Sequence, residues 1–212
     1  MEAVNCGYVT ILHWNMNKKQ TEDMDLVARF LCELGWTDVC LEAGDRPDVV
    51  ALINRKSIGI EVTKFHADER PTFKGSTLRV EEKKKVSKSG GGAYAMWGVT
   101  NLIPGLVTRI NEKIKVATTY DHTCYEQLWL LISSQIPMVN AVVSTFAFPL
   151  DISELNDATH AQLCRSLFSA VHFHLMMTHG VYSWSRTERW QVAKIPATLS
   201  GLTSDTRHSN VD

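Results

Sequence analysis

The segment RPDVVALINRKSIGIEVTK, from Arg46 to Lys64, carries two carboxylates whose spacing suits a metal ion. A four-residue turn over 54–57 predicts a hairpin with Val50 opposite Glu61, and strand alternation then places Asp48 and Glu61 on one face. Diagonal neighbours in such a hairpin lie about 7–8 Å apart at their Cα atoms, so both carboxylates can reach one cation. Their oxygen atoms suit Mg²⁺ or Mn²⁺, which would activate a water molecule and neutralise charge on a phosphate.

Lys64 follows the carboxylate pair, but it lies one residue beyond the position that shares their face of the strand. Strand alternation puts Thr63 on the carboxylate face and Lys64 on the other. A β-bulge at Thr63 would turn Lys64 inward. Alternatively, a helix lysine supplies the charge, either Lys113 or Lys83, or no lysine serves at all.

An ordinary surface hairpin is the competing interpretation of the same segment. Pro-Asp dipeptides are common in turns, and a solvated strand face would carry Asp48, Glu61 and Thr63 for solubility alone. Gly59 shares the carboxylate face and would let a ligand or another backbone come close.

The elements around the hairpin are predicted from hydrophobic periodicity and from the residues that cap or end helices. Thr21 is the expected N-cap of an amphipathic helix that Gly35 ends. Further strands are expected at 37–43, 48–53, 58–65, 126–133 and 140–148, further helices at 106–120 and 156–180, and a closing hairpin at 181–195. The sequence therefore predicts one mixed α/β (α+β) domain over 1–197, with a central sheet flanked by helices and with a long C-terminal helix and hairpin.

Residues 66–104 and 198–212 differ in composition from the rest of the chain. The first segment is rich in charge, Gly and Ser and is expected to form a flexible insertion, and the second is expected to be a disordered tail. A cluster of basic residues in the insertion could contact a phosphate backbone, although a solvated helix face is the alternative. Its members are Arg79, Lys83, Lys84, Lys85 and Lys88.

Composition limits the classes of partner. The formal net charge is -1, so any polyanion would need a local basic patch rather than a global field. The apolar stretches are interrupted by polar residues and Pro, and the N-terminus lacks a signal-peptide pattern, so no membrane contact is expected. Five scattered cysteines without a CxxC pair indicate reduced thiols in the cytoplasm.

The histidines and tryptophans near the C-terminus are interpreted as structural. His172, His174 and His179 fall within the expected helix 156–180, where buried or surface roles are commoner than metal ligation. His66, directly after a strand, is better placed to orient water or phosphate. Trp184 and Trp190 are expected to pack across the closing hairpin rather than stack on bases.

The hairpin and its neighbours resemble the PD-(D/E)XK nuclease superfamily, whose restriction-endonuclease-like core has the order αβββαβ. The matching pieces are the helix 21–34, PDVVA (Pro47–Ala51), IGIEV (Ile58–Val62), the helix LVTRINEKIKVA and the strand QLWLLI. LCELGW…PDVVA…IEV is similar to the corresponding run in archaeal Holliday-junction resolvases. IGIEVT followed by RVEE is similar to a set of bacterial proteins with a nuclease-like core.

The resemblance implies a Mg²⁺- or Mn²⁺-dependent endonuclease acting on nucleic acid, DNA more than RNA. It implies that Asp48, Glu61 and the Val62 carbonyl hold the metal, and that the first helix adds an acid. Glu22 is the candidate there, although it is out of register with the family position. The resemblance also allows a homodimer, since nucleases of this fold that cut both strands often act as dimers.

The family pattern places its lysine two residues after the second acid, where this chain has Thr63. Lys64 or Lys113 is then the candidate for orienting the attacking water. A catalytically inactive nuclease-fold module that binds a partner is the alternative from another functional class. A structural domain unrelated to nucleases is the third interpretation.

Overall fold

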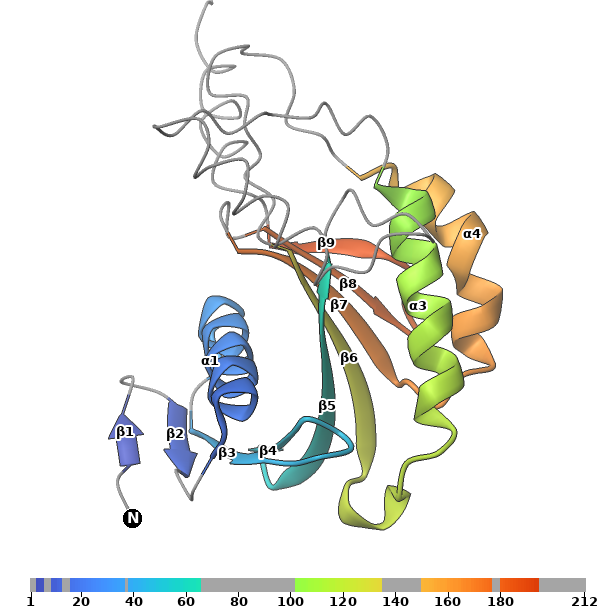
Figure 1. Ribbon diagram of the computed structural model, residues 1–212. Helices are drawn as coiled ribbons and strands as arrows, with labels where there is room; N and C mark the ends of the chain where they lie inside the picture. The colour runs from blue at the N-terminus through green and yellow to red at the C-terminus, as the bar shows by residue number, and fades with distance from the viewer. Residues whose placement is uncertain are drawn as a thin grey trace, which may run out of the picture.

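The computed structural model describes residues 3–5, 9–12, 16–36, 38–65, 102–134, 150–176 and 180–194. These ranges form a nine-stranded sheet with helix α1 against one face and helices α3 and α4 against the other (Figure 1). The helices are α1 (Lys18–Glu33), α3 (Ile103–Ala117) and α4 (Ile152–Cys164). The strands are β1 (Ala3–Asn5), β2 (Val9–Leu12), β3 (Val39–Ala43), β4 (Val49–Ile53), β5 (Lys56–Phe65), β6 (Gln127–Ser134), β7 (Ala170–Leu175), β8 (Gly180–Ser185) and β9 (Gln191–Lys194).

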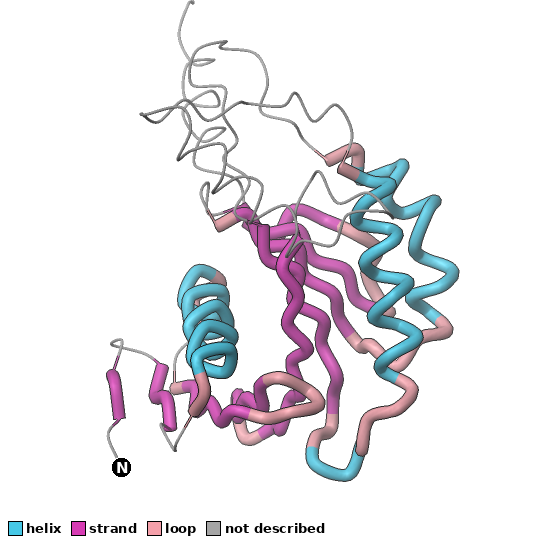
Figure 2. Tube along the Cα trace, viewed as in Figure 1, coloured by secondary structure: helices cyan, strands magenta, loops and turns pink. Residues whose placement is uncertain are grey.

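The strands lie in the sheet in chain order, and the sheet is mixed. Strands β3, β4 and β5 are antiparallel, whereas β5, β6 and β7 are parallel. Strands β5 and β6 run side by side along an eight-residue register (Figure 2). Each parallel pair needs a crossover connection, and α3 and α4 lie in the two connections that flank β6. The mixed α/β class predicted from the sequence is confirmed.

The N-cap of helix α1 lies four residues before the predicted one. The side chain of Asn17 accepts a hydrogen bond from the Gln20 N–H, and the Gln20 side chain accepts one from the Asn17 N–H. This reciprocal capping box satisfies two backbone donors at once, so Asn17 rather than Thr21 starts the helix. The predicted stop is confirmed, because Gly35 directly follows the cap residue Leu34 and has a φ of +75°.

Two hydrophobic cores lie on the two faces of the sheet. Met24, Val27 and Phe30 of α1 pack on one face against side chains such as Ile60. Ile110 of α3 and residues of α4 pack on the other face. Glu61 and Thr63 fall between inward-facing apolar residues of β5 and are themselves buried. The carboxylate face of the hairpin is therefore covered by α3 instead of being a solvated surface.

The predicted long helix 156–180 is wrong. Helix α4 ends at Cys164, and Ala170–Leu175 form strand β7 between β6 and β8. All six residues of β7 are buried. Its sequence AVHFHL alternates apolar residues with histidines, but Ala170 and His174 also continue the helical spacing of Leu163 and Leu167, so the helical pattern extends through it. The N-cap of α4 is Asp151, whose side chain accepts from the Glu154 N–H.

Other expectations have mixed outcomes. The closing hairpin is confirmed as β8 and β9, whereas β1 and β2 precede α1 and were not predicted. The predicted strand 140–148, the tail 198–212 and most of the insertion 66–104 lie outside the described residues.

Candidate functional site

The β4–β5 hairpin is tighter than the sequence predicted. Its turn consists of Asn54 and Arg55, both with positive φ, and the pairing runs from Ile53–Lys56 to Val49–Ile60. Positive φ at both central positions is the type I′ turn that matches the twist of a two-residue hairpin. The predicted register was therefore wrong by two residues.

An even shift leaves every side chain on its predicted face. Asp48 and Glu61 therefore share a face, as strand alternation predicted, but the continued register places them directly opposite each other rather than diagonally. Opposed residues have Cβ atoms about 4.5–5.5 Å apart, closer than the predicted diagonal pair. The change in register brings the two acids closer together.

Asp48 is buried and held from two sides. Its Oδ2 accepts a hydrogen bond of 2.9 Å from the Val62 N–H, and its Oδ1 pairs with the Lys19 ammonium of α1. The Asp48 carbonyl accepts from the Gly44 N–H at 2.8 Å, which closes the loop before β4. These contacts fix the carboxylate at the point where β4 begins.

Glu61 is buried opposite Asp48 and contacts α3 and the residues after it. The Lys113 ammonium lies 2.6 Å from Glu61 Oε1, and the Tyr120 hydroxyl donates to the same carboxylate. Burial and, secondarily, the Asp48 carboxylate raise the pKa of Glu61, while Lys113 and Tyr120 oppose that rise. Positive charge beside Glu61 is therefore electrostatically favoured.

The lysines divide between the two faces of β5. Strand β5 pairs with β6 without a register break from Ile58 to Phe65, so the alternative of a bulge at Thr63 is wrong. Lys64 forms an ion pair with Glu22 of α1, on the face opposite Glu61. Lys113 supplies the ammonium on the carboxylate face, which was one of the alternatives left open by the sequence.

Sequence reasoning missed Lys19, Asp23 and Tyr120. Lys19 lies 3.0 Å from Asp23 and also contacts Asp48, so it bridges two buried acids. Burial raises the pKa of Asp23, and the hydrogen bond from Lys19 opposes that rise. One usable signal existed, because Asp23 lies three and seven residues before buried Leu26 and Phe30 and so interrupts an apolar stripe with an acid.

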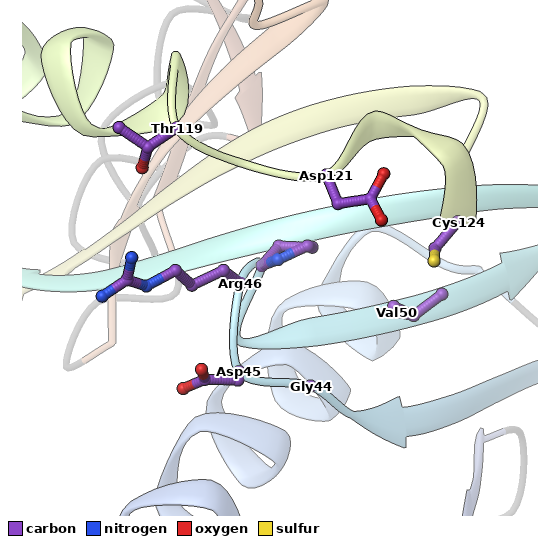
Figure 3. A pocket seen from close by; sticks show the side chains of 8 residues that line it. Gly44, Asp45, Arg46, Val50, Thr119, Asp121 and Cys124 are labelled. Carbon is purple, nitrogen blue, oxygen red and sulfur yellow. The ribbon is translucent and has the colours of Figure 1, made fainter.

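A pocket of about 420 Å³ lies near the start of β4 (Figure 3). It lies between the loop before β4 and the segment after α3, and its lining includes Pro47, which precedes Asp48, and Thr119 and Asp121, which precede and follow Tyr120. In Figure 3 the Arg46 side chain extends away from Asp121. The lining residues are Gly44, Asp45, Arg46, Pro47, Val50, Thr119, Asp121 and Cys124.

Gly59 makes room for packed side chains, whereas the sequence predicted the approach of a ligand or another backbone. A Cβ atom at this position would lie 2.7 Å from Pro47 Cγ and 2.9 Å from the Tyr125 ring. Pro47 and Tyr125 therefore fill the space that a side chain would need. This contact fixes the loop that carries Asp48 against β5.

The donor set at the hairpin is composed of oxygen atoms. Among the described residues, no group of three or more His, Cys, Asp or Glu side chains is arranged to hold a metal ion. Asp48 and Glu61 supply two carboxylates, and the Val62 carbonyl leaves β5 on the same edge as the N–H that binds Asp48. Two carboxylates and a carbonyl, completed by water, fit the requirements of Mg²⁺.

The histidines of β7 lie apart from the carboxylates. His172 Nδ1 is 2.8 Å from Ser183 Oγ, and His174 Nε2 is 2.9 Å from Glu33 Oε2. Burial lowers the pKa of His172 to about 3, so its ring is neutral at ordinary pH. Their place on a strand corrects the predicted helical setting, although both are buried, as a structural role requires; His179 lies outside the described residues.

Trp184 and Trp190 are buried against α4 rather than available for stacking on bases. The Trp184 indole N–H donates to His160 Nδ1, and the Trp190 indole N–H donates to Thr159 Oγ1. Both rings are buried, as a packing role requires, and their indole N–H groups contact α4. Packing of one ring on the other across the hairpin stays a prediction.

His66 and the basic residues Arg79, Lys83, Lys84, Lys85 and Lys88 lie outside the described residues. Comparisons of the chain with protein-family models, with curated proteins and with solved structures found no match. In the described part of the chain, none of the helices has the length and apolar character needed to cross a membrane.

Proposed function

We propose that this protein is a metal-dependent, nuclease-like hydrolase that cleaves phosphodiester bonds in nucleic acid. The observation that carries the proposal is the pair of buried carboxylates, Asp48 and Glu61, opposed across β4 and β5 with a helix lysine on one of them. Two acids buried side by side repel each other, and such an arrangement is commoner at functional sites than in purely structural cores.

The order of elements supports the same proposal. Helix α1, strands β3, β4 and β5, helix α3 and strand β6 follow one another as in the αβββαβ core of the PD-(D/E)XK superfamily. Asp48 and Glu61 lie on the second and third of these strands or at their ends, as the superfamily pattern requires. Strands β1, β2 and β7–β9 extend this core at its two sides.

Asp48, Glu61 and the Val62 carbonyl would hold Mg²⁺ or Mn²⁺ in this site. The bound ion supplies a water molecule of lowered pKa and neutralises charge on the phosphate. Asp48 is oriented for this role by the Val62 N–H, and Glu61 is oriented by the Tyr120 hydroxyl. These second contacts restrict the carboxylates to the geometry that oxygen ligation needs.

Lys113 takes the part that the superfamily assigns to the lysine after the second acid. It approaches Glu61 from α3, so its ammonium lies on the carboxylate face and can orient water or stabilise charge on a phosphate. Lys64 is paired with Glu22 on the opposite face, and neither is assigned a role in the reaction. Nucleic acid, DNA more than RNA, is the proposed substrate.

An inactive binding module is the second candidate. Lys19 neutralises Asp48 and Lys113 neutralises Glu61, so the pair also satisfies the requirements of a structural ion-pair network. In that case the nuclease-like core would present a partner-binding surface and cut nothing.

Cleavage of labelled DNA and RNA oligonucleotides separates the two candidates. With Mg²⁺ or Mn²⁺ we expect wild-type cleavage that falls at least about a hundredfold in Asp48→Asn and Glu61→Gln, because each variant loses several kcal/mol of charge stabilisation. Asp45→Asn is the matched control. Asp45 lies in the same loop as Asp48 and lines the pocket, but it is not one of the two opposed carboxylates. Equal cleavage by wild type and both site variants would refute the hydrolase proposal.

A further inference from the structure

One carboxylate oxygen of Asp48 binds the protein backbone, and the other binds a lysine. Oδ2 accepts from the buried Val62 N–H, and Oδ1 pairs with Lys19. Losing the backbone contact would leave a buried donor without a partner, which is the more costly change. Oδ1 is therefore the oxygen that a cation can take, and Lys19 now occupies it.

The two lysines on the acid pair differ in their surroundings. The Lys19 side chain is 71% exposed, whereas the Lys113 side chain is 21% exposed. Water can replace the partners of the mostly exposed Lys19 ammonium more readily than those of Lys113, so Lys19 is the lysine that a cation would displace. Lys113, whose side chain is mostly covered, is the less mobile of the two.

Asp23 gives Lys19 a second partner. The Lys19 ammonium lies 3.0 Å from Asp23 Oδ2, one helical turn along α1, while it also contacts Asp48. When Lys19 leaves Asp48 it can stay paired with Asp23. Release from Asp48 therefore does not leave Asp23 as a buried carboxylate without a counter-ion.

We propose that Lys19 is a built-in competitor for the cation site, which occupies Asp48 Oδ1 in the metal-free protein and moves to Asp23 alone when a divalent cation binds. The proposal rests on the proposed metal-binding function and adds a means of tuning it. Lys19 holds the acid pair in place without a metal and sets how much free cation is needed to load the site. Lys113 stays on the carboxylate face throughout.

Mn²⁺ binding to the full chain, measured by isothermal titration calorimetry, tests this role. Lys19→Gln should tighten the Kd about threefold to tenfold, the range expected from removing one exposed ion-pair partner. Lys18→Gln is the matched control, because it removes the same charge from the neighbouring exposed residue of α1. Lys18→Gln should change the Kd less than twofold, by about the effect of a distant screened charge.

The same substitution in an Asp48→Asn background locates the effect. If Lys19 competes at Asp48, Lys19→Gln should no longer tighten binding there, because the contact is already lost. Melting curves should show Lys19→Gln folded, with Lys19→Met as the replacement variant if it is not.

The outcomes separate the two proposals. Equal Kd values for wild type and Lys19→Gln, with binding weakened but still measurable in Asp48→Asn, would overturn the competitor role and leave the metal site standing. Equal tightening by Lys18→Gln and Lys19→Gln would also overturn it, as a general charge effect. If the wild type binds no Mn²⁺, or if Asp48→Asn leaves the Kd for Mn²⁺ unchanged, both the competitor role and the proposed function would be overturned.

Discussion

Helices α1 and α3 cover opposite faces of the sheet (Figure 1). Glu61 of the acid pair contacts Lys113 of α3, whereas His172 packs against Phe30 of α1, so the acid pair and the histidines form two separate buried polar regions. Asp48 and Glu61 are paired with lysines that reach them from the partly exposed rim of the site. His172 instead packs against the rings of Phe30 and Trp129 and is kept neutral by burial. Buried carboxylates with replaceable counter-ions can exchange them for a metal, whereas a buried neutral imidazole has no charge to exchange.

The largest expected effect distinguishes the two lysines beside β5. Lys113→Met should lower cleavage about a hundredfold, because it removes a positioned charge near the reacting phosphate. Lys64→Met removes the same group from the opposite face and should change the rate less than about threefold. Rates on one oligonucleotide at saturating metal measure both, and a larger loss in Lys64→Met would contradict the assignment of the carboxylate face.

Gly59→Ala should weaken the packing that carries Asp48. Its Cβ would lie 2.7 Å from Pro47 Cγ and 2.9 Å from the Tyr125 ring, so the loop or the ring must move. We expect a loss toward the upper end of about 1–3 kcal/mol in the free energy of unfolding, measured by urea denaturation. A loss below about 0.5 kcal/mol would show that this contact does not restrain the loop.

Acid should destabilise the histidine region through His172. Its pKa is about 3 in the folded chain, against 6.5 for a histidine exposed to water, so the unfolded chain binds the extra proton between these values. The contribution is fully present above pH 6.5 and falls as the pH drops, by about 1.4 kcal/mol per unit, or about 2 kcal/mol by pH 5.

Urea denaturation at pH 7 and pH 5 measures this slope as the difference between wild type and His172→Gln. The subtraction removes the contributions of other groups, including Glu33 and His174 on the same face. His172→Gln should lose less stability than wild type between the two pH values. Parallel losses would show that His172 is protonated or exposed in the folded protein.

The smallest expected effect concerns the orientation of Glu61. Tyr120→Phe removes the hydroxyl that donates to Glu61 and leaves the ring in place. We expect about 1 kcal/mol less transition-state stabilisation, or roughly a fivefold lower rate. Tyr125→Phe is the control, because the Tyr125 hydroxyl contacts His122 and not Glu61. Equal effects of the two substitutions on the rate would show that Tyr120 does not orient Glu61.

Strand alternation predicted correctly which side chains of the candidate site share a face of the hairpin. Asp48 and Glu61 share a face and Lys64 lies off it, although the turn was two residues shorter than predicted, because an even shift preserves alternation. The stop of α1 at Gly35 followed from its tolerance of positive φ. Strand β7 was missed although its sequence AVHFHL alternates apolar residues with histidines, because Ala170 and His174 also continue the helical spacing of Leu163 and Leu167.

The sequence by itself therefore determined which side chains face one another within the hairpin and where α1 ends, since these depend on neighbours a few residues apart. Only the tertiary structure decided the partners of the acids: Lys19 for Asp48, and Lys113 and Tyr120 for Glu61. Those partners are 29 and 52 residues away in the two ion pairs, and no periodicity within one element links them. Their meeting depends on how α1 and α3 pack on opposite faces of the sheet, which is a property of the whole core.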